Sequence, residues 1–99
     1  MITEIAILKI KKDSKRQFET NFKKASKIIS SINGYIDHEL LKCLEEENKY
    51  LLVVQWDKIE DHIIGFRNSL DYIKWKELLH HFYDPFPTVE HYEKINLKK

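Results

Sequence analysis

Residues 56–92, WDKIEDHIIGFRNSLDYIKWKELLHHFYDPFPTVEHY, decide how this chain folds. The stretch contains both tryptophans, four of the five histidines and three of the five tyrosines of the protein. It begins at the end of an apolar strand, continues through helical patterns and passes a Pro-Phe-Pro break into a last strand. A small protein that gathers its rings and imidazoles in one third of its length either lines a pocket or closes a core there.

Two helical segments are predicted inside this stretch, over residues 58–66 and 70–82. Asn68-Ser69 separates them, and Ser69 is expected to cap the second segment. Pro85 and Pro87 end the helical pattern, because proline lacks a backbone N–H and forces its predecessor into an extended conformation. The apolar stripe of the second segment consists of Tyr72, Trp75, Leu79, Phe82 and Tyr83.

The remainder of the chain adds strands and one longer helix. Strand character is found over residues 2–10, 35–45, 50–56 and 88–97. A helix is expected from Ser14, which has capping-box spacing to Gln17, to about Ile32. Gly34 ends this helix, because glycine readily adopts the left-handed conformation of a helix C-terminus. The order β-α-β-β-α-β predicts a single α+β domain of the ferredoxin-like type over residues 1–99.

Both faces of the predicted antiparallel sheet are apolar. Ile5 and Ile7 lie on one side of the first strand, whereas Ala6 and Leu8 lie on the other. The two helices of this fold cover one face only. The second face would expose more apolar surface than a monomer usually shows, and burying it contributes about 25 cal/mol per Å². The sequence therefore predicts a homodimer with its sheets face to face.

The composition excludes several classes of protein. The 99 residues are 42% hydrophobic and 33% charged, with a formal net charge of +1, which is typical of a globular domain. Neither a nucleic-acid partner nor a membrane is expected, because no overall basic excess and no apolar run of about 20 residues is present. The lone Cys43 permits no internal disulfide, and residues 1–4 show no signal-peptide pattern. We expect a cytoplasmic protein.

The second half of the chain resembles the antibiotic biosynthesis monooxygenase (ABM) domain family. The resemblance is carried by Trp56-Asp57, Gly65-Phe66-Arg67-Asn68-Ser69, Tyr72, Trp75 and residues 80–92. It implies a dimeric α+β barrel with a pocket between sheet and helices in each subunit. It also implies oxygenation of small phenols or quinols without metal, flavin or haem. Proteins of this fold also include isomerases and members without known activity, so likeness of fold alone carries function weakly.

Haem degradation is another activity found on this fold, and it requires residues that this sequence does not have. Members of that branch are similar in using a strand Asn together with a Trp and a His on the second helix. The corresponding positions here are occupied by Phe66 and Lys76, and residues 2–10 contain no Asn. We therefore expect no haem and no other cofactor.

Histidine is suited to act as the base in such a reaction, because its unperturbed pKa is near 6.5. His62 shares a helix face with Ile59 and Phe66, so it is expected to face the sheet. His91 shares a strand face with Val89 and is the second candidate. For both, the alternative is a core histidine held by a hydrogen bond.

Aromatic rings suit the walls of such a pocket, because flat rings stack on flat substrates. The predicted substrate-binding residues are Trp56, Phe66, Tyr72, Trp75, His80 and Phe82. The stiff loop 83–87 is expected either to roof the pocket or only to direct the last strand. Arg67 is placed to bind a substrate anion or to pair with Asp71 one helical turn away.

No metal site is predicted. His80 and His81 are adjacent and cannot face one ion from a helix, and no His-x-x-x-His or Cys-x-x-Cys spacing occurs. Three functions remain open: a cofactor-free oxygenase, a non-catalytic small-molecule-binding or stress-response protein, and a cofactor-free isomerase. A cavity of roughly 300 Å³ with an imidazole in its wall would favour an enzyme, whereas a closed aromatic core would favour the second alternative.

Overall fold

The computed structural model describes residues 1–98; Lys99, the last residue of the predicted domain, lies outside this range. The elements are β1 (Ile2–Lys9), α1 (Lys15–Ile29), β2 (Tyr35–Lys42), β3 (Lys49–Trp56), the π-helix η1 (Asp61–Phe66), α2 (Leu70–Leu79), the 3₁₀ turn η2 (His80–Phe82) and β4 (Val89–Glu93). The predicted α+β ferredoxin-like order is confirmed. Within residues 1–98, each helix is too short or too polar to cross a bilayer.

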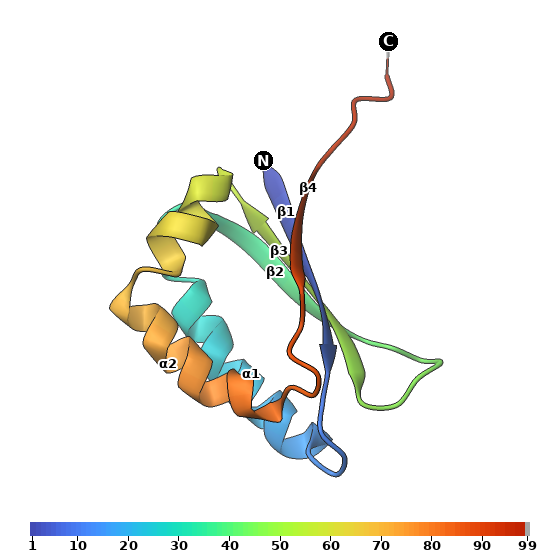
Figure 1. Ribbon diagram of the computed structural model, residues 1–99. Coiled ribbons are helices and arrows are strands. Elements are labelled where there is room, and N and C mark those ends of the chain that lie inside the picture. Colours follow the sequence, from blue (N-terminus) through green and yellow to red (C-terminus); the bar gives the residue numbers. More distant parts are fainter. Residues whose placement is uncertain (99) are drawn as a thin grey trace.

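The four strands form one antiparallel sheet in the order β2-β3-β1-β4. β1 therefore lies inside the sheet, where Ala6 faces Leu52 on β3 and Val89 on β4. The helices lie together on one side of this sheet (Figure 1). The Asn21 side chain of α1 donates a hydrogen bond to the Leu78 carbonyl oxygen of α2 at 3.0 Å, which joins the two helices.

The helix-covered face of the sheet holds the core. Alternate residues of each inner strand point to this side, because side chains in a strand alternate between faces. On α1, apolar residues recur at helical spacing and pack against them. The buried apolar side chains of β1, β3 and α1 are Ala6, Leu8, Tyr50, Leu52, Val54, Trp56, Phe18, Phe22, Ala25 and Ile29.

The opposite face of the sheet carries the other alternation set. Ile7 of β1 is 50% exposed, and Leu41 of β2 and Tyr92 of β4 are also exposed. Ile5, Leu51 and Val53 are partly exposed beside them. Within residues 1–98 no helix covers this face (Figure 1). The structure therefore leaves open the apolar surface that the sequence predicts for contact with a second copy.

Several predictions are wrong in detail: the second strand ends at Lys42 rather than Glu45, and the helical turns predicted over residues 58–66 form a π-helix over Asp61–Phe66. The hydroxyl group of Ser14 makes no capping hydrogen bond to the helix and instead approaches the Lys12 carbonyl oxygen at 3.5 Å. The α1 helix ends at Ile29 rather than Ile32, and the N–H groups of Ser31 and Ile32 then donate to the Ile28 and Ile29 carbonyl oxygens in turns. The last strand ends at Glu93 rather than Leu97, because β1 begins at Ile2 and offers no further partner beyond it.

Simple strand alternation would place Tyr35 on the opposite face from His38, and the structure departs from it. An irregularity in the pairing of β2 with β3 between Tyr35 and Asp37 shifts the alternation by one residue. Tyr35 thereby joins His38 on the helix side, whereas Ile36 is exposed. The His38 ring bonds to the Tyr35 hydroxyl group and, at 2.8 Å, to the Ser26 hydroxyl group of α1. This histidine fastens the edge strand to α1 and lies outside the cavity described below.

Candidate active site

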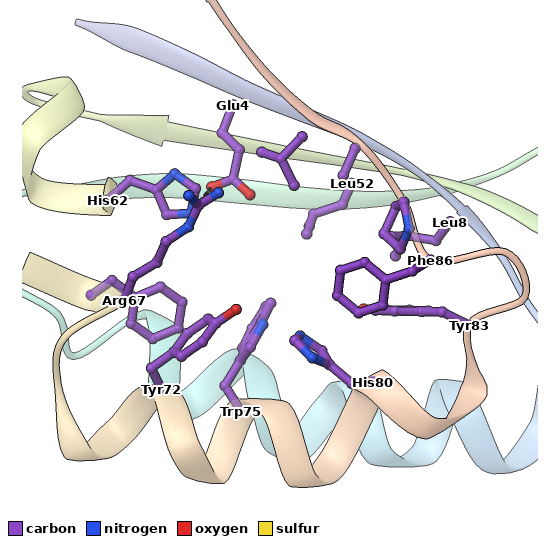
Figure 2. A pocket seen from close by; sticks show the side chains of 14 residues that line it. Glu4, Leu8, Leu52, His62, Arg67, Tyr72, Trp75, His80, Tyr83 and Phe86 are labelled. Atoms are coloured by element: carbon purple, nitrogen blue, oxygen red, sulfur yellow. Dashed lines mark ion pairs between the residues drawn. The ribbon is translucent and has the colours of Figure 1, made fainter. Parts of the chain in front are cut away.

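A cavity of ≈ 370 Å³ lies between the sheet and α2 (Figure 2). Strands β1, β3 and β4 form one side of it, and η1, α2, η2 and the loop before β4 form the other. It is lined by Glu4, Ala6, Leu8, Leu52, His62, Phe66, Arg67, Tyr72, Trp75, His80, Tyr83, Phe86, Pro87 and Val89. Its walls therefore combine flat rings and aliphatic side chains with a few polar groups, as is usual for small-molecule sites.

The helical side of the cavity depends on the geometry of η1. Its wider turns bring the Arg67 N–H to the His62 carbonyl oxygen at 3.1 Å, a bond that spans five residues. His62 and Phe66 are both buried against the sheet. Ser69 then begins α2 by accepting a hydrogen bond from the Tyr72 N–H at 3.2 Å, which confirms the predicted cap. Tyr72 and Trp75, three residues apart, consequently face the cavity together (Figure 2).

The rings of this side pack edge to face. Phe66 contacts Tyr72 with ring centroids 5.1 Å apart and Trp75 with centroids 5.5 Å apart, at interplanar angles of 88° and 79°. At the far end, His80 lies edge-on to Phe86 with centroids 4.9 Å apart. Tyr83 and Phe86 border the cavity, so the loop 83–87 forms part of its wall (Figure 2).

The polar end of the cavity is built around Glu4. Its carboxyl oxygen Oε1 accepts a hydrogen bond from Trp56 Nε1 at 2.9 Å, and His62 Nε2 lies 3.4 Å from the same atom. The other ring nitrogen of His62, Nδ1, lies 2.8 Å from His91 Nε2. The His62 ring also stacks on Trp56, with centroids 5.4 Å apart and an interplanar angle of 18°. Glu4, His62 and His91 thus form one continuous row of polar groups.

Burial shifts the protonation of this row. Glu4 is 5% exposed, and burial raises its pKa to about 7 although the Trp56 hydrogen bond and the positive charge of Arg67 favour the ionised form. His62 is 4% exposed, and burial, together with Arg67 and His91, lowers its pKa to about 3. Burial and Arg67 lower the pKa of His91 as well. Near neutral pH both imidazoles are therefore uncharged, and Glu4 is the group that changes protonation.

The structure brings most of the predicted site residues together. Phe66, Tyr72, Trp75 and His80 line the cavity, as does His62. His91 lies directly behind His62, and its partly exposed ring does not border the cavity.

Two predicted wall residues are core residues instead. Trp56 is enclosed between Tyr35, His62 and Phe66, with its indole N–H used by Glu4. Phe82 packs on Phe18 of α1, with centroids 5.7 Å apart. Both rings support the cavity from behind because they fill the space between the sheet and the helices.

Glu4 is the main site residue that the sequence reading missed. Strand alternation could have identified it, because Glu4 belongs to the same alternation set as Ala6 and Leu8. Its carboxyl group is therefore expected to face the core. Arg67, for which two roles were considered, lines the cavity rather than forming a surface pair with Asp71 (Figure 2).

The geometry of the row also bears on metal binding. Glu4 and His91 approach opposite nitrogens of the His62 ring, so the three side chains do not converge on one point. In the described part of the chain, no group of three His, Cys, Asp or Glu side chains has a metal-binding arrangement.

Comparisons with known proteins agree with this architecture. The family model for antibiotic biosynthesis monooxygenases matches residues 1–78. The chain is 53% identical over 95 residues to the uncharacterized protein YczJ of Bacillus subtilis, and this alignment covers 96% of the chain and 100% of the relative.

Solved structures extend the comparison. A candidate antibiotic biosynthesis monooxygenase from Bordetella bronchiseptica superposes with a TM-score of 0.91 at 27% identity, over 96% of this chain and 97% of that one. SnoaB, a cofactor-independent oxygenase from Streptomyces nogalater, superposes with a TM-score of 0.76 at 16% identity, over 99% and 97% of the two chains, a likeness that shows the fold alone. ABM proteins typically form dimeric barrels. Because the family model spans most of its length, the chain belongs to the antibiotic biosynthesis monooxygenase family.

Proposed function

We propose that this protein is a cofactor-independent monooxygenase that acts on a small aromatic substrate of the phenol or quinol type. One observation carries the proposal: a cavity of ≈ 370 Å³ has ring-lined walls and a polar end where buried Glu4 meets His62. The volume exceeds the roughly 300 Å³ that a small-molecule site needs. The cavity disfavours a protein whose core is closed by side chains, whereas a non-catalytic small-molecule-binding protein would share the cavity and would differ from the oxygenase by its lack of oxygen uptake.

The chemistry asks three things of the protein. A base removes a proton from the substrate, a positive or hydrogen-bond-donating group stabilises the resulting anion, and apolar walls exclude water. The electron-rich anion then reacts with O₂. For an anthrone, one oxygen atom enters the ring as a carbonyl group, and the other leaves as water with the two hydrogen atoms lost by the substrate.

The cavity has a group for each task. Trp75 and Phe66 offer faces and edges against which a flat substrate can stack. Arg67 lies at the same end as Glu4 and supplies a positive charge close to a developing oxyanion (Figure 2). The proton acceptor belongs to the row Glu4, His62 and His91.

We also propose that a second copy of the chain covers the open face of the sheet. The face presents Ile7, Leu51 and Val53 from its two inner strands, side chains that gain by leaving water. The dimeric barrels typical of the family support this arrangement. The cavity lies on the opposite side of the sheet, so each subunit keeps its own site.

Oxygen uptake tests the proposed activity. The purified protein is mixed with anthrones such as dithranol and with hydroquinones, and O₂ consumption above the uncatalysed rate is recorded. We expect catalysed uptake that falls about 100-fold in His62→Ala, since loss of acid–base function typically costs that much or more. The matched control is His81→Ala, which removes an exposed imidazole next to the cavity wall and should keep the parent rate.

Anaerobic calorimetry with the same compounds separates the alternatives. Binding in the micromolar to millimolar range without any oxygen uptake would support a non-catalytic binding protein and contradict the oxygenase. Product that is an isomer of the added compound, formed without O₂, would point to an isomerase.

A further inference from the structure

Glu4 is an unusual residue for its position. It lies on an inner strand, on the face otherwise occupied by Ala6 and Leu8, and is 5% exposed. Burying a carboxyl group costs free energy unless the group is hydrogen-bonded. A carboxyl group that is kept in such a position is a candidate for a function. Both of its contacts, from Trp56 and His62, are made to Oε1, so that Oε2 remains for a guest in the cavity that Glu4 lines (Figure 2).

The two histidines lead away from the cavity. His62 borders the cavity next to Glu4, and its Nδ1 lies 2.8 Å from Nε2 of His91. His91 is directly opposite Glu4 in the pairing of β1 with β4, and β4 is an edge strand of the sheet. Its ring is partly exposed and lies outside the cavity wall. The three residues therefore connect the enclosed end of the cavity to solvent by a route that does not cross the space for a substrate.

We propose that Glu4, rather than either histidine, accepts the substrate proton, and that His62 and His91 are positioning residues that carry the proton onward to solvent. This inference rests on the proposed function, because the proton donor is the aromatic substrate. It adds a residue from β1 to a set of candidate catalytic residues otherwise drawn from the second half of the chain.

The proton path balances in two steps. In the first, the O–H bond of a phenol or quinol, or the C–H bond opposite the carbonyl group of an anthrone such as dithranol, breaks, the proton binds to the Glu4 carboxylate, and the substrate becomes an anion beside Arg67. In the second, the carboxyl proton moves to His62 Nε2, the Nδ1 proton of His62 moves to His91 Nε2, and the Nδ1 proton of His91 leaves to water. One proton has then passed from substrate to water, Glu4 is a carboxylate again, and each imidazole is neutral but in the opposite tautomer, which must be exchanged before the next turnover.

The protonation behaviour of the row supports this order of roles. A general base works best when its pKa lies near the working pH, which fits Glu4 at about 7 better than His62 at about 3. Titratable and charged groups face Glu4 from each element around it. His62 comes from η1, and Arg67 follows directly after η1. The others are His91 of β4, Tyr72 of α2 and Tyr83 of the following loop. Of these, only Arg67 is charged at neutral pH.

The indole N–H of Trp56 gives a test that needs no substrate. It is hydrogen-bonded to Glu4, so its ¹H–¹⁵N NMR signal should shift with a midpoint near pH 7 when Glu4 titrates. Trp75, the second tryptophan, has no such contact and serves as the internal control for folding. The transition should be absent in Glu4→Gln and present, with an altered midpoint, in Glu4→Asp. A Trp56 signal that is flat from pH 5 to 9, or that titrates unchanged in Glu4→Gln, would overturn the proposal.

Turnover distinguishes Glu4 from the histidines. With dithranol, Glu4→Gln should lower kcat about 100-fold or more and leave KM within about threefold, since the variant retains the shape of the cavity but not its base. His91→Gln should lower kcat about tenfold, leave KM unchanged, and move the acidic limb of the pH–rate profile. A Glu4→Gln protein with the parent kcat, beside an inactive His62→Ala, would assign the base to histidine and overturn the proposal while the oxygenase activity stands. Absence of oxygen uptake in the parent protein would contradict the proposed function, and the Trp56 titration would still decide whether Glu4 is a proton site.

Discussion

At the scale of single residues, the chemistry of this protein depends on where burial places a few polar groups. Glu4 and His62 lie next to each other and are both more than nine-tenths buried, and burial shifts the pKa of each toward its neutral form. The imidazole of His62 is neutral near pH 7, and Glu4, with a pKa of about 7, is ionised only in part, so the site avoids a full isolated charge in the interior. The same arrangement links stability to pH.

Comparison of the parent protein with Glu4→Gln should reveal that link. The folded-state pKa of Glu4 is about 7, above the ordinary value of 4.5, so the native state holds the proton more tightly than the unfolded state. The resulting stabilisation is complete below about pH 4.5 and is lost as the pH rises through 7. Between pH 4.5 and 8 the free energy of unfolding of the parent, relative to the variant, should fall by up to about 3 kcal/mol. Urea unfolding of both proteins across this range measures it.

His62 has the opposite sign. Its lowered pKa means that its contribution is present above pH 6.5 and is lost as the pH falls toward 3. Because both proteins contain His62, this contribution largely cancels in the difference. A difference between parent and variant that does not change with pH would contradict the raised pKa of Glu4.

Gly34 shows a steric requirement at the same scale. Its φ of 86° lies in the left-handed region, and a Cβ at this position would overlap the Asp61 carboxyl group, which accepts the Lys58 N–H at 3.0 Å. We expect Gly34→Ala to lower the free energy of unfolding by about 1–3 kcal/mol. Gly65→Ala is the matched control, since the nearest atom to its added Cβ would be the Glu60 carbonyl oxygen at 3.8 Å. Equal midpoints in chemical denaturation for the two variants would refute the steric argument.

The sequence predicts part of the site at this scale and misses part of it. The face of His62 follows from helical spacing to Phe66, and both are buried as expected. Glu4 was overlooked although strand alternation places it among core residues. The burial of Trp56 behind the cavity, by contrast, depends on distances between η1 and the sheet that no local pattern contains.

At the scale of elements, the break between η1 and α2 lies in the wall of the cavity, between Phe66 and Tyr72. The π-helical turns of η1 end at Phe66, and α2 starts four residues later with Ser69 as its cap. π-helical turns are often found at functional sites, because they redirect side chains relative to an α-helix. The sequence predicted the break from Asn68-Ser69, but the widened turn itself arises from packing against the sheet.

The two predicted caps provide a matched pair of variants. Ser69→Ala removes a side chain that accepts the Tyr72 N–H, so it should lower the free energy of unfolding by about 1 kcal/mol. Ser14→Ala removes a hydroxyl group that makes no such bond to α1 and should change it by only a few tenths of a kcal/mol. Thermal or urea unfolding compares them directly. An effect of Ser14→Ala as large as that of Ser69→Ala would mean that the predicted capping box forms in solution.

At the scale of the whole molecule, the sheet separates two environments. One face carries the core and the cavity, and the other carries Ile7, Leu41 and Tyr92 without cover from residues 1–98. The sequence predicted from strand alternation that both faces of the sheet are apolar, except near Tyr35, where an irregular pairing shifts the alternation. The observed strand order β2-β3-β1-β4 belongs to the ferredoxin-like arrangement that the element order β-α-β-β-α-β predicted.

Sedimentation velocity tests the proposed dimer. The parent protein should sediment at about twice the mass of the 12.0 kDa chain. Ile7→Glu, at the centre of the open face, should shift it to the monomer, because a charge buried between two sheets is strongly unfavourable. Ile73→Glu is the control, since Ile73 on α2 is 49% exposed, nearly the same as the 50% of Ile7, but lies away from this face. A monomeric parent at micromolar concentration would exclude the dimer.

The irregular pairing near Tyr35 has a consequence for assembly. β2 and β4 are the two edges of the sheet, where unpaired backbone groups invite strands from other molecules. The break in alternation at Tyr35–Asp37 interrupts one edge, and the other edge has only five residues and follows Pro85 and Pro87. Neither edge offers a long, regular template, so lateral growth into fibrils is disfavoured. Two molecules of this shape can stack, but they cannot readily extend one another's sheets.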